Sequence, residues 1–132
     1  MIGSCFCTAL RKATRKLTSI YDDALAPVGV NIAQFSLLRN VERGEPVSLT
    51  DLGQRIELDR STVGRNVKVL VKSGLIALSK GKDQREAVLA LTDNGRRVLA
   101  DGFPLWEAVQ KKVEAVLGPN GLKELQTLLK AI

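Results

Sequence analysis

The spacing of apolar residues changes at Gly74, and this change constrains the fold more than any other feature of the sequence. Before Gly74, apolar residues recur three or four positions apart, which is the pattern of amphipathic helices. Residues 75–79 and 86–91 instead have the pattern of two strands, separated by a polar loop that contains a glycine. Two short helices, 49–56 and one opened by Asp59, stand directly before this hairpin. This order predicts a helix-turn-helix followed by a β-wing.

Further helices are predicted on both sides of this unit. Apolar stripes indicate helices over residues 6–25 and 32–43, and Asp93 restarts a helical pattern after the hairpin. Pro104 predicts a kink or a break in that last pattern, and Gly118–Pro119 closes it before a final segment. We therefore expect a mainly α fold with a small β-hairpin (α+β), built as a winged helix-turn-helix with extra helices at both chain ends.

The chain has the length of one domain but carries more apolar helix surface than one domain needs. With 132 residues, 45% of them apolar, we expect a single winged-helix domain over 1–132, in which 31–92 form the winged helix-turn-helix. The helices within 1–26 and 93–132 have more apolar surface than a three-helix core can cover. We expect them to be dimerisation helices that pack against a second copy in a homodimer. The alternative is that they fold back on their own core.

The net charge of +6 arises from one segment of the chain. Residues 60–97 hold nine basic and three acidic residues, an excess of +6 that equals the charge of the whole chain. A local positive field of this kind attracts polyanions, and nucleic acid is the usual one. One alternative is a basic surface that serves solubility. Another is a winged-helix module that binds protein, although this gives no reason for confining the charge to one segment.

The helix opened by Asp59 presents one face that is polar and basic. When such a helix enters the major groove of DNA, its first turn is the part that meets the base edges. Arg65 is placed to pair with guanine O6 and N7, whereas Lys68 and Lys72 are placed for phosphates. The predicted DNA contacts on this helix are Arg60, Ser61, Thr62, Arg65, Lys68 and Lys72.

The tip of the predicted wing is also basic. Lys80, Lys82 and Arg85 lie in or beside its loop, and an arginine on a narrow projection can enter a minor groove. Asp83 is expected to pair with Arg85 and to hold the guanidinium in place. The alternative is that Asp83 only favours the turn. We predict that all four residues belong to the DNA-binding surface.

Several other classes of function find little support in the sequence. The chain has no histidine and no glycine-rich phosphate loop, so we expect neither an enzyme nor a bound cofactor. An alternative is a metal sensor in which Cys5 and Cys7 of two subunits supply four thiolates. No run of about 20 apolar residues and no secretory signal is present, so we expect a cytoplasmic protein with no membrane partner.

The wing contains a motif of a known family. Asp83, Arg85, Leu91 and Thr92 follow the pattern D-x-R-x-x-x-x-x-L-T, which resembles the wing signature of the MarR (multiple antibiotic resistance regulator) family. Residues 25–34, reading L-A-P-V-G-V-N-I-A-Q, and the order of the helices extend the resemblance over nearly the whole chain. The resemblance implies a sequence-specific transcriptional regulator that acts as an obligate homodimer on double-stranded DNA. Such a regulator is usually a repressor released by a small molecule or by thiol oxidation, and its two-fold symmetry implies a pseudo-palindromic operator.

The same resemblance implies a pocket for a small aromatic acid between the dimer helices and the winged unit. The aromatic residues that fall in this region are Tyr21, Phe35 and Trp106. Because large aromatic residues also fill protein cores, the alternative is that all three are core residues.

A second possible effector site lies at the start of the first helix. Ser4 is a plausible N-cap there, which would put Cys5 and Cys7 in a first turn whose free N–H groups stabilise a thiolate. The peroxide-sensing branch of the family has a reactive cysteine near this point and a tyrosine fourteen residues later, as Cys7 and Tyr21 do. A second tyrosine of that branch is replaced by Ile32. We expect Cys7 to be the more oxidisable thiol; the alternative is that both cysteines pack as small apolar residues at the dimer interface.

Overall fold

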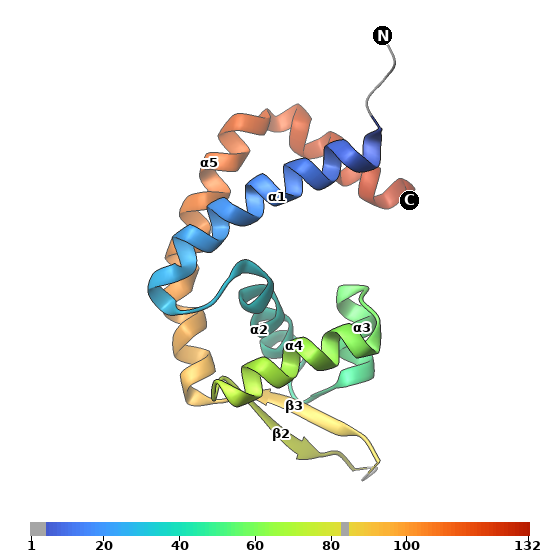
Figure 1. The fold of residues 1–132 in the computed structure, drawn as a ribbon, viewed down its shortest axis with the longest axis vertical. Coiled ribbons are helices and arrows are strands. Elements are labelled where there is room, and N and C mark those ends of the chain that lie inside the picture. The colour runs from blue at the N-terminus through green and yellow to red at the C-terminus, as the bar shows by residue number, and fades with distance from the viewer. Residues whose placement is uncertain (1–4, 83–84) are drawn as a thin grey trace.

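The computed structural model describes residues 5–82 and 85–132 of the chain. Figure 1 shows an upper arm, in which the first helix lies beside the second half of the last one, and a lower part that holds the remaining helices and the sheet. The elements in chain order are α1 (Phe6–Leu25), the 3-10 turn η1 (Ala26–Val28), α2 (Ile32–Gly44), β1 (Val47–Ser48), α3 (Leu49–Ile56), α4 (Arg60–Lys72), β2 (Ile76–Lys80), β3 (Ala87–Leu91) and α5 (Asp93–Ala131). The predicted α+β fold with a small hairpin is confirmed.

The sheet has three antiparallel strands in the order β1-β3-β2. Strands β2 and β3 form the predicted hairpin, each beginning one residue later than expected, with Ile76 opposite Leu91. Strand β1, which was not predicted, pairs Val47 with Leu89 on the other side of β3. Because β1 is only two residues long, it contains no repeat from which a strand could be recognised. Strand β3 therefore lies in the centre of the sheet, and its Leu89 is fully buried.

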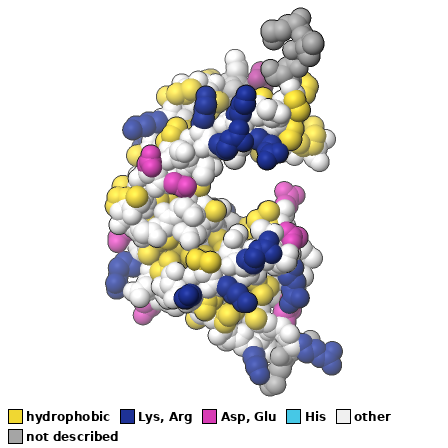
Figure 2. Space-filling view, viewed as in Figure 1, with side chains coloured by type: hydrophobic (Ala, Val, Ile, Leu, Met, Phe, Trp, Pro, Cys, Tyr) yellow, Lys and Arg dark blue, Asp and Glu magenta, His cyan; other side chains and the backbone are white. Residues whose placement is uncertain are grey.

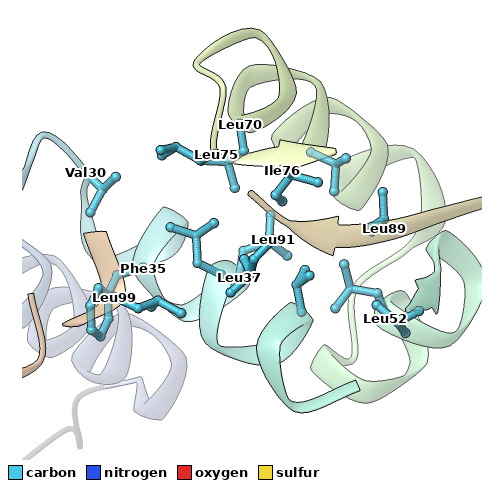
Figure 3. Close-up of a cluster of buried hydrophobic side chains, with 14 of the residues drawn as sticks. Val30, Phe35, Leu37, Leu52, Leu70, Leu75, Ile76, Leu89, Leu91 and Leu99 are labelled. Carbon is cyan, nitrogen blue, oxygen red and sulfur yellow. The ribbon is translucent and has the colours of Figure 1, made fainter. Parts of the chain in front are cut away.

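The core lies between the sheet and helices α2, α3 and α4. Figure 3 shows this cluster, with Leu37 from α2, Leu52 from α3 and Leu70 from α4 facing the strands, and with Phe35 from α2 beside Leu99 of α5. The apolar stripes predicted for these helices supply most of the buried residues. Three residues of these stripes, Ile32, Ile56 and Val71, are only partly buried and pack against the rim of the core.

The break predicted at Pro104 is wrong. Helix α5 runs without interruption past this proline, and within α5 only Gly118 has non-helical backbone angles, φ 69° and ψ 171°. A proline inside a helix frees the carbonyl group four residues earlier, here that of Ala100. Ala100 and Pro104 are both exposed, so water can satisfy that carbonyl. The interruption predicted at Gly118–Pro119 is found where expected.

Side-chain caps fix the start of three helices. Asn31 and Gln34 form a capping box at α2, with hydrogen bonds of 2.8 and 2.9 Å. Ser48 accepts a hydrogen bond from the Asp51 N–H at α3, and Thr92 accepts one from the Gly95 N–H at α5, both at 3.0 Å. These caps satisfy N–H groups that a helix leaves free at its first turn.

Gly95 provides a stability test of the point where the wing meets α5. A Cβ atom at Gly95 would lie 2.2 Å from the backbone oxygen of Leu75, so the two segments would have to separate. We expect Gly95→Ala to lower the free energy of unfolding by about 1–3 kcal/mol. Gly64→Ala is the control, because Gly64 is also helical and has open space around it; it should raise stability by up to about 1 kcal/mol.

The measurement is urea unfolding followed by circular dichroism at one fixed protein concentration. Equal midpoints for Gly95→Ala and wild type would show that the close contact does not constrain the fold.

Candidate nucleic-acid interface

Helix α4 divides into a buried and an exposed face. Val63, Val67 and Leu70 are almost completely buried against the core. Among the predicted contacts, Thr62 is partly buried, and the exposed ones are Arg60, Ser61, Arg65, Lys68 and Lys72. The structure thus places all six on one helix whose outer side faces solvent. Their contact with DNA stays a prediction.

The turn between α3 and α4 holds these two helices close together. The N–H of Leu58 donates to the Gly53 carbonyl over 3.0 Å, and a Cβ atom at Gly53 would lie only 3.1 Å from the Leu58 oxygen. Glu57 adopts the left-handed conformation, φ 57° and ψ 40°, which residues other than glycine rarely adopt. A residue with a side chain pays a small conformational penalty there. The predicted helix-turn-helix is therefore present.

A small hydrogen-bonded network orders the first turn of α4. The hydroxyls of Ser61 and Thr62 both donate to the Asp59 carboxylate, each over 2.5 Å. Arg65 Nη2 in turn donates to the Thr62 hydroxyl oxygen over 3.3 Å. The bonds from Ser61 and Thr62 lower the pKa of Asp59 to about 2, so this group is ionised at neutral pH. The sequence had identified Asp59 only as an N-cap.

The wing lies beside this helix-turn-helix. Lys80, Lys82 and Arg85 are exposed, as expected for a basic tip. The Gly81 N–H donates to the Glu86 carbonyl over 3.1 Å and closes the end of the hairpin. Asp83 lies outside the described residues, and so does its predicted pairing with Arg85.

Glu45 connects the wing to helix α5, and sequence reasoning missed it. One carboxylate oxygen accepts a 2.9 Å hydrogen bond from the Leu91 N–H at the end of β3, and the other pairs with Arg96 of α5. Burial raises the pKa of Glu45, but the hydrogen bonds from Leu91 and Arg96 outweigh this and lower its pKa overall. The sequence around Glu45 indicates only the end of α2. Its two partners are 46 and 51 residues away, so no local pattern could have revealed them.

The structure changes the expectation for the two thiols. Cys5, rather than Ser4, is the N-cap residue of α1, and Ser4 lies outside the described residues. Both cysteines are free and exposed. Hydrogen bonds from the backbone and side chain of Thr8 lower the pKa of Cys5. The thiolate stabilisation expected for both cysteines is therefore supported for Cys5, which was expected to be the less oxidisable of the two.

Tyr21 does not meet Cys7 within one chain. Fourteen residues of α-helix separate them by about 21 Å along the axis. The Tyr21 hydroxyl instead donates to the side chain of Gln110 on α5. Burial, together with the negative charge of Glu114, raises the pKa of Tyr21. A contact between Cys7 and Tyr21 would require two subunits.

The three residues predicted for an effector pocket are only partly brought together. Phe35 and Trp106 stack with ring centroids 6.5 Å apart, whereas Tyr21 is engaged about one turn further along α5. The guanidinium of Arg39 lies 4.5 Å from the centre of the Trp106 ring. Two surface cavities of about 230 and 200 Å³ share Phe35 and Arg39 in their walls. Phe35 itself is almost fully buried and belongs to the core.

Other kinds of site are not found in the described part of the chain. No three acidic, cysteine or histidine side chains of residues 5–82 and 85–132 gather in a way that could hold a metal ion. Among the helices that the structure describes, none combines the length and the apolar composition needed to cross a bilayer.

A helix-turn-helix whose second helix exposes a basic face, followed at once by a basic hairpin, defines a winged helix-turn-helix protein. Known proteins agree with this. The MarR family model matches residues 28–86. The crystal structure of the transcriptional regulator MosR of M. tuberculosis in complex with DNA has 35% sequence identity, covers 97% of this chain and 96% of that chain, and superimposes with a TM-score of 0.86.

More distant proteins are also similar to this chain. MarR of E. coli in its apo form is 18% identical, over 98% of this chain and 97% of that one, with a TM-score of 0.74. The HTH-type transcriptional regulator TcaR of Staphylococcus aureus is 24% identical over 106 residues, which is 78% of this chain and 70% of TcaR. The chain belongs to the MarR family. It is a transcriptional regulator, and the expectation that it is not an enzyme is confirmed.

Proposed function

We propose that this chain is a homodimeric repressor that binds double-stranded DNA at a specific pseudo-palindromic site. The observation that carries the proposal is the exposed basic face of α4, which continues into the basic wing. MosR, its relative, has been crystallised with DNA. In this proposal residues 31–92 bind DNA, and the helices within 1–26 and 93–132 form the dimer.

The proposed roles follow from position along α4. The first turn, with Arg60, Ser61 and Thr62, meets base edges, and Arg65 pairs with guanine. Lys68 and Lys72 lie further along and bind phosphates, which carry no sequence information. In Figure 2 dark-blue side chains lie over the lower part and around the wing tip. Lys80, Lys82 and Arg85 form that tip, and Arg85 enters the minor groove.

DNA binding is tested by selecting a preferred duplex from a random library and measuring affinities at fixed salt. Arg65→Ala should weaken binding to that duplex by about 1–3 kcal/mol and relax the preference at one position, because it removes a base contact. Lys72→Ala should weaken all sequences alike and reduce the salt dependence, because it removes a phosphate contact. A wild-type protein that prefers no duplex over random DNA would contradict the proposal and favour a protein-binding module.

The proposed dimer interface is the exposed apolar surface of α1 and α5. Val116, Leu129 and Ile132 are 86%, 67% and 92% exposed, and Phe6 at the start of α1 is 86% exposed. A groove of about 350 Å³ between the two helices is lined by Leu17, Ile20 and other apolar residues, together with Lys16 and Lys112. Such a surface is unfavourable in water. A second copy offers a matching apolar face. The two-fold axis of such a dimer presents two copies of α4, the recognition helix, to one duplex.

The dimer is tested with substitutions that a monomer tolerates. Val116 is exposed, so Val116→Glu should leave the fold intact but put a charge into the interface. We expect light scattering to report a monomer, or a dissociation constant raised at least about tenfold. Gln126→Glu adds the same charge at an exposed polar position and should remain dimeric. Deleting residues 119–132 should also abolish the dimer. Unchanged dimers in both cases would place the interface elsewhere.

We further propose that thiol oxidation releases the DNA. A Cys5 thiolate attacks one oxygen of a hydroperoxide, forms a sulfenic acid and releases an alcohol once the leaving alkoxide takes a proton. A second thiol then condenses with the sulfenic acid to a disulfide, within or between subunits, and water leaves. The sequence favoured Cys7 as the first to react, whereas the lowered pKa of Cys5 supports Cys5.

The redox proposal is tested by titrating wild type, Cys5→Ser and Cys7→Ser with cumene hydroperoxide while fluorescence anisotropy reports DNA binding. We expect oxidation to weaken wild-type binding at least about tenfold. The variant without the first-reacting thiol should keep its affinity. If all three proteins stay bound after mass spectrometry shows that their thiols are oxidised, the switch is refuted. Release by a small aromatic acid at the cavities beside Arg39 and Trp106 would then be the remaining proposal.

A further inference from the structure

Asp59 is an unexpected residue on a surface that binds DNA. Its carboxylate is exposed and ionised at the start of α4, beside the residues proposed to reach base edges. A negative charge at this place repels phosphates and lowers the affinity for every duplex. Many polar residues serve as N-caps, so capping alone does not call for a residue that also opposes binding.

The direction of the hydrogen bonds explains what Asp59 adds. A hydroxyl has one hydrogen to donate and two lone pairs with which to accept. Ser61 and Thr62 both give their hydrogen to Asp59. Thr62 also accepts from Arg65, so its oxygen connects the arginine to the carboxylate. The exposed Ser61 oxygen is left with lone pairs only.

An acceptor without a hydrogen distinguishes among the groups that DNA presents. Phosphate oxygens, guanine O6 and thymine O4 are themselves acceptors, and cannot bond to it. Only the amino groups of adenine N6 and cytosine N4 can donate in the major groove. A free serine hydroxyl would bond to either kind and would discriminate much less.

We infer that Asp59 is a specificity-determining positioning residue: it makes Ser61 a pure acceptor for a base amino group and holds Arg65 in place through Thr62. This inference rests on the proposed function, since it assigns a role within the α4–DNA contact. Asp59 repels the phosphates of every duplex, and only a duplex that offers the amino group regains affinity through the bond to Ser61, so the specificity arises from that bond.

The experiment compares the selected duplex with random DNA for wild type, Asp59→Asn and Asp59→Ser. Asparagine and serine are both good N-caps and neither has a carboxylate, so both variants should fold. Circular dichroism checks this. We expect random DNA to bind more tightly and the ratio of the two affinities to fall about tenfold. Asp93→Asn is the control: Asp93 is exposed in the first turn of α5, and its loss changes the charge equally. Its ratio should stay at the wild-type value.

A second arm tests the acceptor role of Ser61. Each adenine of the selected half-site is replaced by purine, and each cytosine by 2-pyrimidinone, which removes one exocyclic amino group at a time. One such replacement should weaken wild-type binding about tenfold but leave Ser61→Ala and Asp59→Ser unchanged.

The outcomes are distinguishable. If wild type prefers its duplex and both Asp59→Asn and Asp59→Ser keep that preference, the inference is wrong and the proposed function stands. If Asp59→Asn weakens both duplexes alike, Asp59 has only a structural role and the inference is again wrong. If wild type has no preference for any duplex, the proposed function fails and the inference fails with it.

Discussion

A backbone hydrogen bond of 3.1 Å, from the Thr92 N–H to the Leu75 carbonyl, closes the open end of the wing where α4, β2, β3 and α5 meet. The Leu75 N–H donates back to Leu70 of α4 over 2.9 Å, so this one residue connects the recognition helix to the wing. The Thr92 hydroxyl donates to the Gly74 carbonyl and also caps α5. Gly95 is required because the Leu75 oxygen occupies the space of a side chain. The threonine that ends the wing motif thus serves both the hairpin and the long helix.

This junction determines how α4 is placed relative to the rest of the molecule. Glu45 adds a second connection, since it binds the end of β3 with one oxygen and Arg96 of α5 with the other. From Asp93 to Leu117 the helix α5 is continuous over about 37 Å. A rigid helix fixed at the wing transmits any rotation of its far end to the recognition helix. The helix α1 lies beside the far half of α5. A change in the angle between these two helices and the lower part of the molecule would therefore move α4, the helix proposed to bind DNA.

Features of local origin were predictable from the sequence. The limits of α1, α3 and α4 follow from apolar periodicity, with a side-chain cap at the start of α3, and the hairpin follows from the change of spacing at Gly74. The exposed basic face of α4 was predictable because its opposite face is apolar. The same rules failed at Pro104, where solvent access to the Ala100 carbonyl decides the outcome, and at β1, which is too short to show a period.

Two kinds of feature were not predictable: contacts between residues far apart in the sequence, and the choice of bonding partner made by a side chain. The role of Glu45 comes from residues more than forty positions away. At Asp59 the partners are close in sequence, but an N-cap normally binds backbone N–H groups, whereas here the carboxylate accepts from two hydroxyls. Because the ionised Asp59 carboxylate can only accept, the hydroxyls must donate, and that direction leaves Ser61 with lone pairs to offer rather than a hydrogen.

The basic residues of α4 and the wing attract DNA, whereas the carboxylate of Asp59 repels it. The basic residues between 60 and 97 attract any duplex, since most of this attraction comes from phosphates and is independent of sequence. A regulator has to find one site among a large excess of others, so the ratio of specific to random affinity matters more than either value alone. Positive charge raises both affinities alike and leaves the ratio unchanged. An ionised carboxylate among the base-reading residues lowers the common attraction and removes hydroxyl hydrogens that would otherwise bond to any phosphate, so a negative residue at the start of a basic helix favours specificity at the expense of affinity.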